Sequence, residues 1–357
     1  MIKTNFIRFL YQNLLKPVFF KIDPESIHDF ITWVGILLGK SKITKSITAF
    51  FLTYSHPSLE QKILGINFNN PVGLAAGFDK NARLTQILPS VGFGFTEIGT
   101  ITGEACSGNP KPRLWRLKES KSLLVYYGLK NDGCETISSR LEKEKFTIPV
   151  ITSIGKTNSQ DTIEEEAGIR DYLKAYRHFT GIGRIFDINI SCPNAFGGSP
   201  FSDPEKLHKL LLQIDKIPTD KPIFIKMPPD LTNQELDGIL EVVKKHKVAG
   251  FICTNLTKQK NHKGGLSGKA VEDLSNHQIQ EIHQKTRGKY VIIGAGGVFS
   301  AEDAYKKIKL GASLVELITG MIFEGPQVIS EINQGLVKLL KKDGYKNISE
   351  AVGTNNL

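Results

Sequence analysis

The sequence of 357 residues predicts an α/β fold, a (β/α)8 TIM barrel with an N-terminal helical appendage. From about residue 70 onward, short apolar segments alternate with amphipathic stretches, which indicates a repeated unit of a strand followed by a helix. Eight such strand segments occur within about 270 residues, and this spacing suits a closed parallel barrel. An open, doubly wound sheet is the alternative.

The N-terminal residues predict two amphipathic helices. Apolar residues recur at helical spacing from Phe6 to Phe19, and Asp23 and Pro24 supply an N-cap and a first-turn proline for a second helix. Residues 1–46 hold seven basic and three acidic residues, a pattern typical of helices that lie on a membrane surface. We therefore expect peripheral membrane contact through residues 1–46, on the cytoplasmic side; a helical cap packed on the barrel is the alternative. No apolar run reaches the ~18 residues of a membrane-spanning helix.

The predicted strands, in order, are 72–77, 95–102, 148–155, 185–191, 222–228, 248–255, 290–297 and 312–320. Polar residues stand at or near the ends of several of them, namely Lys80, Thr100, Asn189, Lys226, Asn255 and Thr319. Because the carboxyl ends of barrel strands meet on one face, we expect these six side chains to converge on one pocket. The chain then divides into a helical extension at 1–56, the barrel at 57–345 and a C-terminal tail at 346–357.

Charge and composition limit the classes of ligand and partner that the chain is expected to bind. The formal net charge of +10 suits anionic ligands or an anionic membrane surface. We expect no nucleic-acid partner, because the chain has no arginine-rich run and no aromatic-basic motif. The four cysteines form no Cys-x-x-Cys pair and the eight histidines do not cluster, so neither a disulfide framework nor a metal site is expected. This cysteine pattern fits a reducing, cytoplasmic compartment.

Glycine-rich segments follow the last two predicted strands. Gly294–Ser300 and Leu317–Pro326 would present bare backbone amides beside a helix start, which is the usual phosphate site of a barrel. Gly264–Gly268 adds a third such segment one unit earlier. Phe299 stands where a dinucleotide fingerprint has its last glycine, so that motif does not fit. Tight turns without a ligand are the alternative.

Two lysines and one cysteine stand where side chains would face the barrel mouth. A lysine at such a position, as Lys80 and Lys226 are, needs an anionic partner or a lowered pKa. Cys192 follows a strand and precedes Pro193, where the chain must leave the sheet. Its thiol is a candidate general base, with an ordinary pKa near ~8.5 that neighbouring lysines would lower. A small core residue is the alternative.

Eight motifs occur in order between about residues 16 and 340: GLAAGFDKN, GFGFTEIGTIT, GNPKPRLWRL, NISCPN, IKMPPDL, GGLSGKA, IIGAGGVFS and GASLVELITGMIFEGP. Together they resemble the dihydroorotate dehydrogenases, FMN-dependent barrel enzymes of pyrimidine biosynthesis. The segment LKPVFFKIDPESIHDFITW resembles the helical extension of the membrane-associated, quinone-reducing class, in which the extension forms a tunnel for quinone. The resemblance implies that dihydroorotate is oxidised to orotate, with quinone as the electron acceptor.

The resemblance also implies site residues. FMN would be held by Ala76, Gly77, Lys80, Thr100, Ser153, Asn189, Lys226, Thr254, Gly268, Gly297, Ile318 and Thr319. The substrate ring would face Lys80, Tyr127, Gly128, Leu129, Asn189, Asn194 and Asn255. Cys192 falls on the catalytic base, which takes a proton from the ring carbon next to a carbonyl while a hydride passes from the adjacent carbon to flavin N5. A positive Lys226 would favour the anionic reduced flavin.

The sequence departs from the family at several of these positions. The quinone-reducing class has serine as its base, whereas Cys192 matches the soluble class. Ser153 replaces an asparagine that contacts FMN, and Ile318 replaces a frequent tyrosine near the tunnel. On the substrate side, Val125 replaces an asparagine that helps to hold the orotate carboxylate, and Leu256 replaces a hydroxyl residue that contacts the pyrimidine.

The substrate-side substitutions have an energetic consequence. Each missing hydrogen bond to a charged group is worth ~1.5–3 kcal/mol. Dihydroorotate binding would weaken by several powers of ten unless Tyr126 or Tyr127 compensates through its hydroxyl. Two alternatives follow: a related enzyme that acts on another cyclic amide or carboxylate, and a flavin-binding or membrane-associated protein without turnover.

Overall fold

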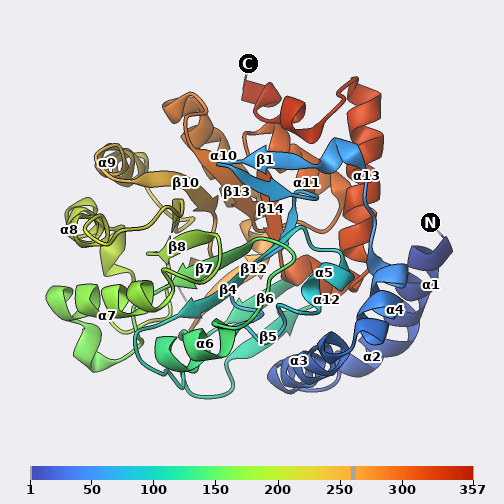
Figure 1. Cartoon of the computed structure of the whole chain (residues 1–357), viewed down its shortest axis with the longest axis horizontal. Coiled ribbons are helices and arrows are strands. Elements are labelled where there is room, and N and C mark those ends of the chain that lie inside the picture. The colour runs from blue at the N-terminus through green and yellow to red at the C-terminus, as the bar shows by residue number, and fades with distance from the viewer. Residues whose placement is uncertain (1, 259–262, 357) are drawn as a thin grey trace.

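The computed structural model describes residues 2–258 and 263–356; Met1 and Leu357, at the ends of the predicted extension and tail, and residues 259–262 lie outside the described residues. Eight parallel strands form a closed barrel, so the predicted (β/α)8 barrel is confirmed and the open-sheet alternative is wrong (Figure 1). The strands are β3 (Val72–Leu74), β4 (Phe95–Ile101), β7 (Val150–Ile154), β8 (Ile185–Asn189), β9 (Ile223–Lys226), β10 (Val248–Cys253), β13 (Val291–Ala295) and β14 (Leu314–Leu317). Each ends one to three residues earlier than predicted, because the polar or glycine-rich residues that follow turn out of the sheet.

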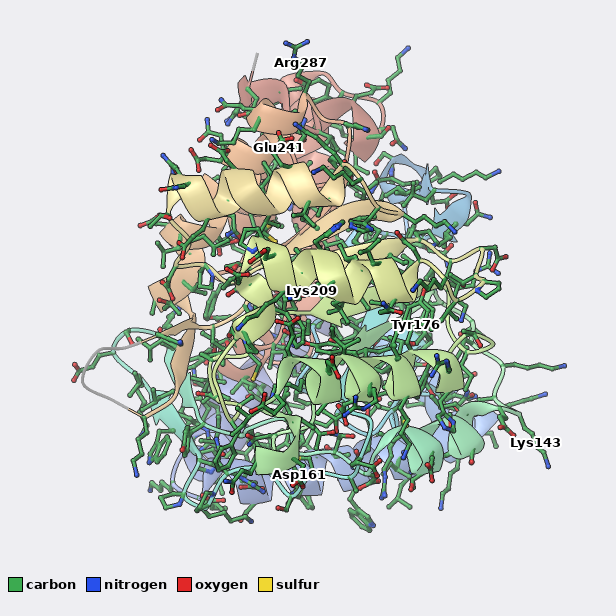
Figure 2. All side chains as sticks on the ribbon, turned by 90° about the vertical axis from the view of Figure 1, so that its left-hand side faces the viewer. Lys143, Asp161, Tyr176, Lys209, Glu241 and Arg287 are labelled. Atoms are coloured by element: carbon green, nitrogen blue, oxygen red, sulfur yellow. The ribbon has the colours of Figure 1, made fainter. Side chains whose placement is uncertain are left out.

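Helices cover the outside of the barrel, in the order α5 (Leu88–Val91), α6 (Cys134–Leu141), α7 (Glu165–His178), α8 (Pro204–Ile214), α9 (Asn233–Val243), α10 (Glu272–Thr286), α11 (Ala301–Lys309), α12 (Thr319–Glu324) and α13 (Val328–Asp343). Figure 2 shows α7, α8 and α9 side by side, with the exposed Lys209 and Glu241 on α8 and α9. On the inner face, the ring of Tyr176 in α7 stacks on Phe186 of β8 at 4.1 Å between centroids. The amphipathic stretches thus bury their apolar faces against the strands.

The amino-terminal end of the barrel is closed by apolar packing. A hairpin of β1 (Gln61–Ile63) and β2 (Ile66–Phe68) lies across this end, and Phe68 meets Phe95 edge to face at 5.7 Å. Buried residues from the strands, among them Ile151, Phe224 and Ile293, complete the same cluster. Polar groups are therefore left to the opposite, carboxyl-terminal end, where barrels place their sites.

The N-terminal extension contains three helical rods, whereas two were predicted. The first consists of α1 (Ile2–Leu10), a π-helical segment η1 (Tyr11–Leu15) and α2 (Lys16–Phe19) in direct succession. The second, α3 (Pro24–Lys40), begins as predicted, with the Asp23 carboxylate accepting from the Ser26 amide at 2.8 Å. The third, α4 (Lys42–Leu52), is separated from α3 by a single N-cap, Ser41, and this break was missed because the apolar pattern continues across it. None of the helices in the described part of the chain is long and apolar enough to span a bilayer.

A second sheet, which the sequence analysis did not predict, lies at the mouth of the barrel. It is antiparallel in the order β11 (Thr257–Lys258), β12 (Gly265–Gly268), β6 (Ser122–Val125) and β5 (Leu114–Leu117). The segment Gly264–Gly268, which was predicted to bind phosphate through turn amides, supplies β12, and its Gly265 pairs with Val125. The sheet was missed because its short strands come from distant segments and each is too short to carry a clear alternation.

The chain ends in two 3-10 turns, η6 (Ile348–Ala351) and η7 (Thr354–Asn356), that pack on the barrel's outer helices. Ile348 and Ala351 are fully buried. The Gly353 amide donates to the Ile308 carbonyl at 3.0 Å. These contacts hold the C-terminal residues against α11 and α13, away from the barrel mouth.

Candidate active site

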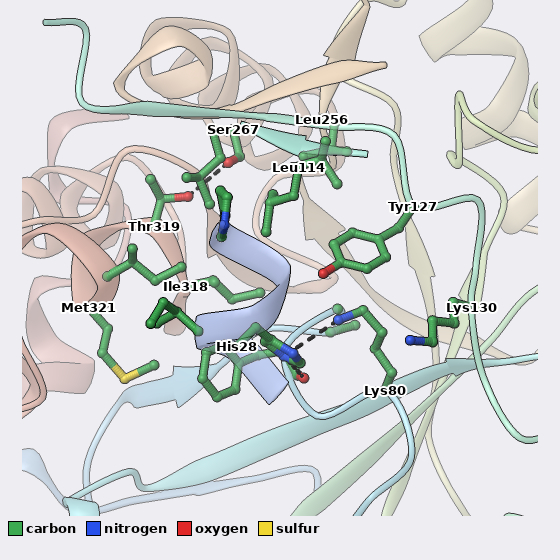
Figure 3. Close-up of a pocket in the computed structure, with 18 of the residues that line it drawn as sticks. His28, Lys80, Leu114, Tyr127, Lys130, Leu256, Ser267, Ile318, Thr319 and Met321 are labelled. Atoms are coloured by element: carbon green, nitrogen blue, oxygen red, sulfur yellow. Dashed lines mark hydrogen bonds between the residues drawn. The ribbon is translucent and has the colours of Figure 1, made fainter. Parts of the chain in front are cut away.

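One cavity of about 570 Å³ runs from the N-terminal helices to the carboxyl ends of the barrel strands. All six polar strand-end residues line it: Lys80, Thr100, Asn189, Lys226, Asn255 and Thr319. So do Ala76, Gly77, Tyr127, Gly128, Leu129, Cys192, Asn194 and Ile318. Figure 3 shows how Lys80 and Tyr127 face His28 on one side of this cavity, with Ile318 and Thr319 on the other. Barrel topology thus brings together residues that are far apart in the sequence.

A smaller cavity of about 90 Å³ adjoins the first and is lined by three more of the predicted cofactor residues, Thr254, Gly268 and Gly297. Gly268 and Gly297 have φ values of +80° and +78°, which favour glycine. A Cβ atom on Gly297 would lie 2.4 Å from Glu272 Cβ, so no side chain fits there. Thr319 Oγ1 lies 2.8 Å from Ser267 Oγ at the junction of the two cavities (Figure 3). Bare amides and hydroxyls in a narrow space suit a phosphate group.

Ser153 does not line either cavity. It is fully buried, its Oγ lies 2.9 Å from Thr100 Oγ1, and it donates to Asp187 Oδ2 at 2.6 Å. Asn189 Nδ2 donates to the same Thr100 hydroxyl at 2.8 Å. The structure therefore places Ser153 behind Thr100, because its side chain points into the barrel interior.

Lys226 finds two carboxyl partners within the chain. Its ammonium donates to Glu97 Oε2 at 2.8 Å and to Glu316 Oε1 at 3.3 Å, and all three side chains are almost fully buried. Burial opposes a charge on Lys226, but Glu316 and Glu97 outweigh it and raise the pKa of the ammonium. Glu97 Oε2 also accepts from the Ala76 amide at 2.8 Å, which ties the strand end of β3 to this group. A permanently charged ammonium thus lines the cavity.

Lys80 has no such partner. Among the described residues no carboxylate lies within ion-pair distance of it; its ammonium sits 4.1 Å from the Tyr127 ring centre and 3.5 Å from His28 Nε2. Burial, with a further contribution from Lys130, lowers the pKa of Lys80 to about 8. Burial and Lys80 lower the pKa of His28 to about 4, so the ring is neutral, with Nε2 2.8 Å from the Phe78 carbonyl. This end of the cavity therefore carries an unpaired cation and suits an anionic ligand.

Two apolar side chains lie where the sequence analysis noted missing polar partners. Val125 and Leu256 both line the cavity. Tyr127 lines it too, and its buried hydroxyl has no hydrogen-bond partner among the described residues. Tyr126 does not line it. Of the two tyrosines considered as compensating donors, only Tyr127 is placed to act.

Cys192 stands in the loop after β8, half-buried at the cavity wall. Burial raises the pKa of its thiol to about 11, although the amides of Asn194 and Ala195 and the charge of Lys156 lower it. The expectation that neighbouring lysines would bring the thiol pKa below its ordinary value is therefore wrong, because desolvation is the larger effect.

Lys156 is a residue that the sequence analysis missed. It is buried, it lines a small cavity together with Cys192, and its ammonium donates to Thr162 Oγ1 at 3.1 Å and to the Phe196 carbonyl at 3.0 Å. No carboxylate of the described chain lies within ion-pair distance of it. A signal for it exists in the sequence, because Lys156 follows the end of β7 by two residues and so stands at the carboxyl end of a barrel strand.

The three asparagines predicted to face the substrate are fixed by hydrogen bonds. Asn189 Oδ1 and Asn255 Nδ2 share the Ser191 hydroxyl, at 2.9 Å each. Asn194 Nδ2 donates to the Val125 carbonyl at 2.9 Å. The Asn194 bond joins the loop after β8 to β6, and the Ser191 hydroxyl fixes the Asn189 and Asn255 amides relative to each other.

Comparison with known proteins identifies relatives along nearly the whole chain. The family model described as "Dihydroorotate dehydrogenase" matches residues 58–340. Two curated relatives are named dihydroorotate dehydrogenase (quinone): one from Natronomonas pharaonis, 37% identical over 97% of this chain and 99% of its own, and one from Nostoc punctiforme, 38% identical over 96% and 98%. Among solved structures, ligand-free DHODH from Eimeria tenella matches with a TM-score of 0.81 at 30% identity, over 93% of this chain and 99% of its own.

Proposed function

The chain belongs to the dihydroorotate dehydrogenase family, and on that premise we propose that it oxidises dihydroorotate to orotate in pyrimidine biosynthesis and passes the electrons to quinone. The observation that carries the proposal is the single cavity that joins the polar strand ends to an apolar passage under the N-terminal helices. Both redox partners would reach one cofactor through it. The curated relatives, which carry quinone in their names, support the same acceptor.

The family is flavin-dependent, and FMN is the flavin that this site fits. We place its phosphate in the smaller cavity near Gly268, Gly297 and Thr319. Its ring would lie against Thr100 and Lys226 in the larger one. Bound there, FMN supplies the hydride acceptor, and the charge of Lys226 favours the reduced form.

The chain's own residues then bind and deprotonate the substrate. Lys80, as an unpaired cation, would hold the substrate carboxylate, and Asn194 and Asn255 would orient the ring by hydrogen bonds. Cys192 Sγ would take the proton from the ring carbon beside the carbonyl. The raised pKa of its thiol makes the thiolate a strong base but a scarce species at neutral pH, so that turnover should rise with pH.

The outer part of the cavity suits quinone. It is lined mostly by apolar side chains of α2, α3 and α12, among them Phe19, Ile31 and Met321. Arg116 is a polar group on this wall and could donate to a quinone oxygen. The passage ends at Phe30, which lines the cavity and is itself 48% exposed.

The exposed face of the N-terminal helices supports peripheral membrane contact through residues 1–46, on the cytoplasmic side of a membrane. Large apolar side chains there are 42–72% exposed: Phe6, Phe9, Leu14, Leu15, Val18, Ile22, Phe30, Trp33, Leu37 and Ile43. Ile47 and Phe50 of α4 continue the set beyond residue 46. Together with the basic surplus, this face is typical of helices that lie in a bilayer interface.

The function is tested by anaerobic reduction. The purified protein should carry a yellow flavin spectrum, dihydroorotate added without oxygen should bleach it, and a short-chain quinone should restore it. If bound flavin stayed oxidised after this addition, dihydroorotate would be refuted as the substrate. That result would favour an enzyme for another cyclic amide or carboxylate, which the apolar Val125 and Leu256 would admit.

Membrane contact is tested by flotation with vesicles that contain anionic lipid. Trp33→Asp, at a side chain 57% exposed, should weaken binding, because a carboxylate would have to enter the interface. Leu212→Asp, on α8 and 43% exposed, is the matched control and should bind as the wild type does. Equal binding by both variants would refute the assignment of this face.

A further inference from the structure

Four ionisable side chains meet inside the barrel, below the cavity: Glu97 of β4, Asp187 of β8, Lys226 of β9 and Glu316 of β14. We call them the core carboxyl cluster. The three carboxyl residues are fully buried and Lys226 is 4% exposed. Lys226 Nζ lies 2.8 Å from Glu97 Oε2 and 3.3 Å from Glu316 Oε1. Lys226 also lines both cavities, so the cluster connects directly to the proposed flavin site.

The cluster contains more acids than one lysine can neutralise. Glu97 and Glu316 both contact the Lys226 ammonium, and Asp187 is near enough to Glu97 and Lys226 for their charges to shift its pKa. One ammonium balances one carboxylate, so the buried group is neutral only if two of the three acids keep their protons. One oxygen on each acid, Glu97 Oε1, Asp187 Oδ1 and Glu316 Oε2, has no donor among the described residues. Three buried carboxylates would leave two uncompensated negative charges, which costs several kcal/mol for each ion.

The arrangement therefore assigns the charges. Glu97 is the ionised member, because it accepts from the ammonium and from the Ala76 amide. Burial and the Glu97 charge raise the pKa of both Asp187 and Glu316, which keep their protons at neutral pH. The cluster is then neutral as a whole. No other titratable group faces Glu316 from the strands beside β14, where Gly73 of β3 and Ala295 of β13 are its register partners.

We propose that Asp187 and Glu316 are positioning residues that act through Lys226, and that the proton of Glu316 sets the reduction potential of bound flavin. The inference rests on the proposed binding of FMN. Loss of the Glu316 proton changes the cluster's charge from zero to minus one, and this opposes the negative charge of reduced flavin. Reduction at alkaline pH then requires Glu316 to take up a proton again.

The test is the midpoint potential of the holoenzyme as a function of pH, measured by equilibration with redox dyes. In the wild type, two-electron reduction should take up one extra proton at alkaline pH. The midpoint potential should then fall by about 30 mV more for each pH unit, which is a tenfold shift of the flavin equilibrium. Glu316→Gln, which is as neutral as the protonated acid, should match the wild type at neutral pH and lack the extra slope. Glu331→Gln, on the outer helix α13, is the matched control and should keep it.

If the midpoint potentials of the wild type and Glu316→Gln changed with pH by the same slope over the whole range, the proposal would be overturned. Infrared spectroscopy supplies a second measurement that needs no flavin. The wild type should show a protonated carboxylic acid band at neutral pH that loses intensity at alkaline pH, and Glu316→Gln should lack this pH-dependent part of the band. If the protein bound no flavin, the proposed function would fail while this band still reported on the cluster. Absence of the band from the wild type would overturn the proposal even if Glu316→Gln failed to fold.

Discussion

Replacing Glu25 by glutamine should weaken the attachment of the N-terminal helices to the barrel. Glu25 lies in the first turn of α3, and its carboxylate accepts from Arg113 Nη2 at 2.8 Å and Arg113 Nε at 3.1 Å. Both side chains are buried, at 4% and 5% exposed. Arg113 precedes β5, so this ion pair joins the helical extension to the sheet at the barrel mouth and holds the cavity wall together.

Two independent routes give the size of the effect. Although burial opposes the charge, hydrogen bonds and charge from Arg113, with Lys130, lower the pKa of Glu25 from 4.5 to about 2. Since a shift of one pKa unit corresponds to about 1.36 kcal/mol, this shift corresponds to about 3 kcal/mol of stabilisation of the folded state. Removal of one partner from a buried ion pair costs about 3–5 kcal/mol. We therefore expect Glu25→Gln to lower the free energy of unfolding by about 3 kcal/mol at pH 7.

Urea denaturation measures this loss, and Glu331→Gln is its control. Glu331 also ties the extension to the barrel, but its partner Arg8 is 54% exposed, so this change should cost less than about 1 kcal/mol. Because the Glu25 pKa is depressed in the folded state, its contribution is complete above pH 4.5 and is lost as the pH falls toward 2. The difference between the wild type and Glu25→Gln should shrink from pH 5 to pH 3. A loss no larger than that of the control, or a difference independent of pH, would refute the reasoning.

Three further changes probe the active site. Val125→Asn, on the cavity wall, should lower the Kd for dihydroorotate ~10-fold or more, because a hydrogen bond to a charged group contributes ~1.5–3 kcal/mol; an unchanged Kd would show that the carboxylate binds elsewhere. Cys192→Ala should abolish bleaching by substrate while flavin stays bound, and the wild-type rate should rise with pH toward the thiol pKa of about 11; bleaching at the wild-type rate would exclude Cys192 as the base. Lys156→Met should slow alkylation of Cys192 at a given pH, because loss of the cation raises the thiol pKa further, and Lys156→Arg should restore it. Equal alkylation in all three proteins would remove Lys156 from this role.

The position of the site could be predicted from the sequence because its signals are local. A strand is visible as a short apolar run, and in a parallel barrel every strand end faces the same side. Lys80, Asn189 and Lys226 were therefore located correctly at the mouth before any contact was known. The motif around Cys192 was equally local, and the comparisons agree with the family that it suggested.

Charge states and partners, in contrast, were decided by the tertiary structure. The sign of the Cys192 pKa shift depends on how much protein excludes water from the thiol, and the place of Ser153 depends on which way its side chain turns. Glu316 carries no signal in the sequence, since it becomes exceptional only where β4 and β9 bring Glu97 and Lys226 against it. The sequence by itself determined the strands, their order and the residues at their ends. Burial and pairing across strands decided which of those residues carry charge, because desolvation and Coulomb energies depend on distances in space and not along the chain.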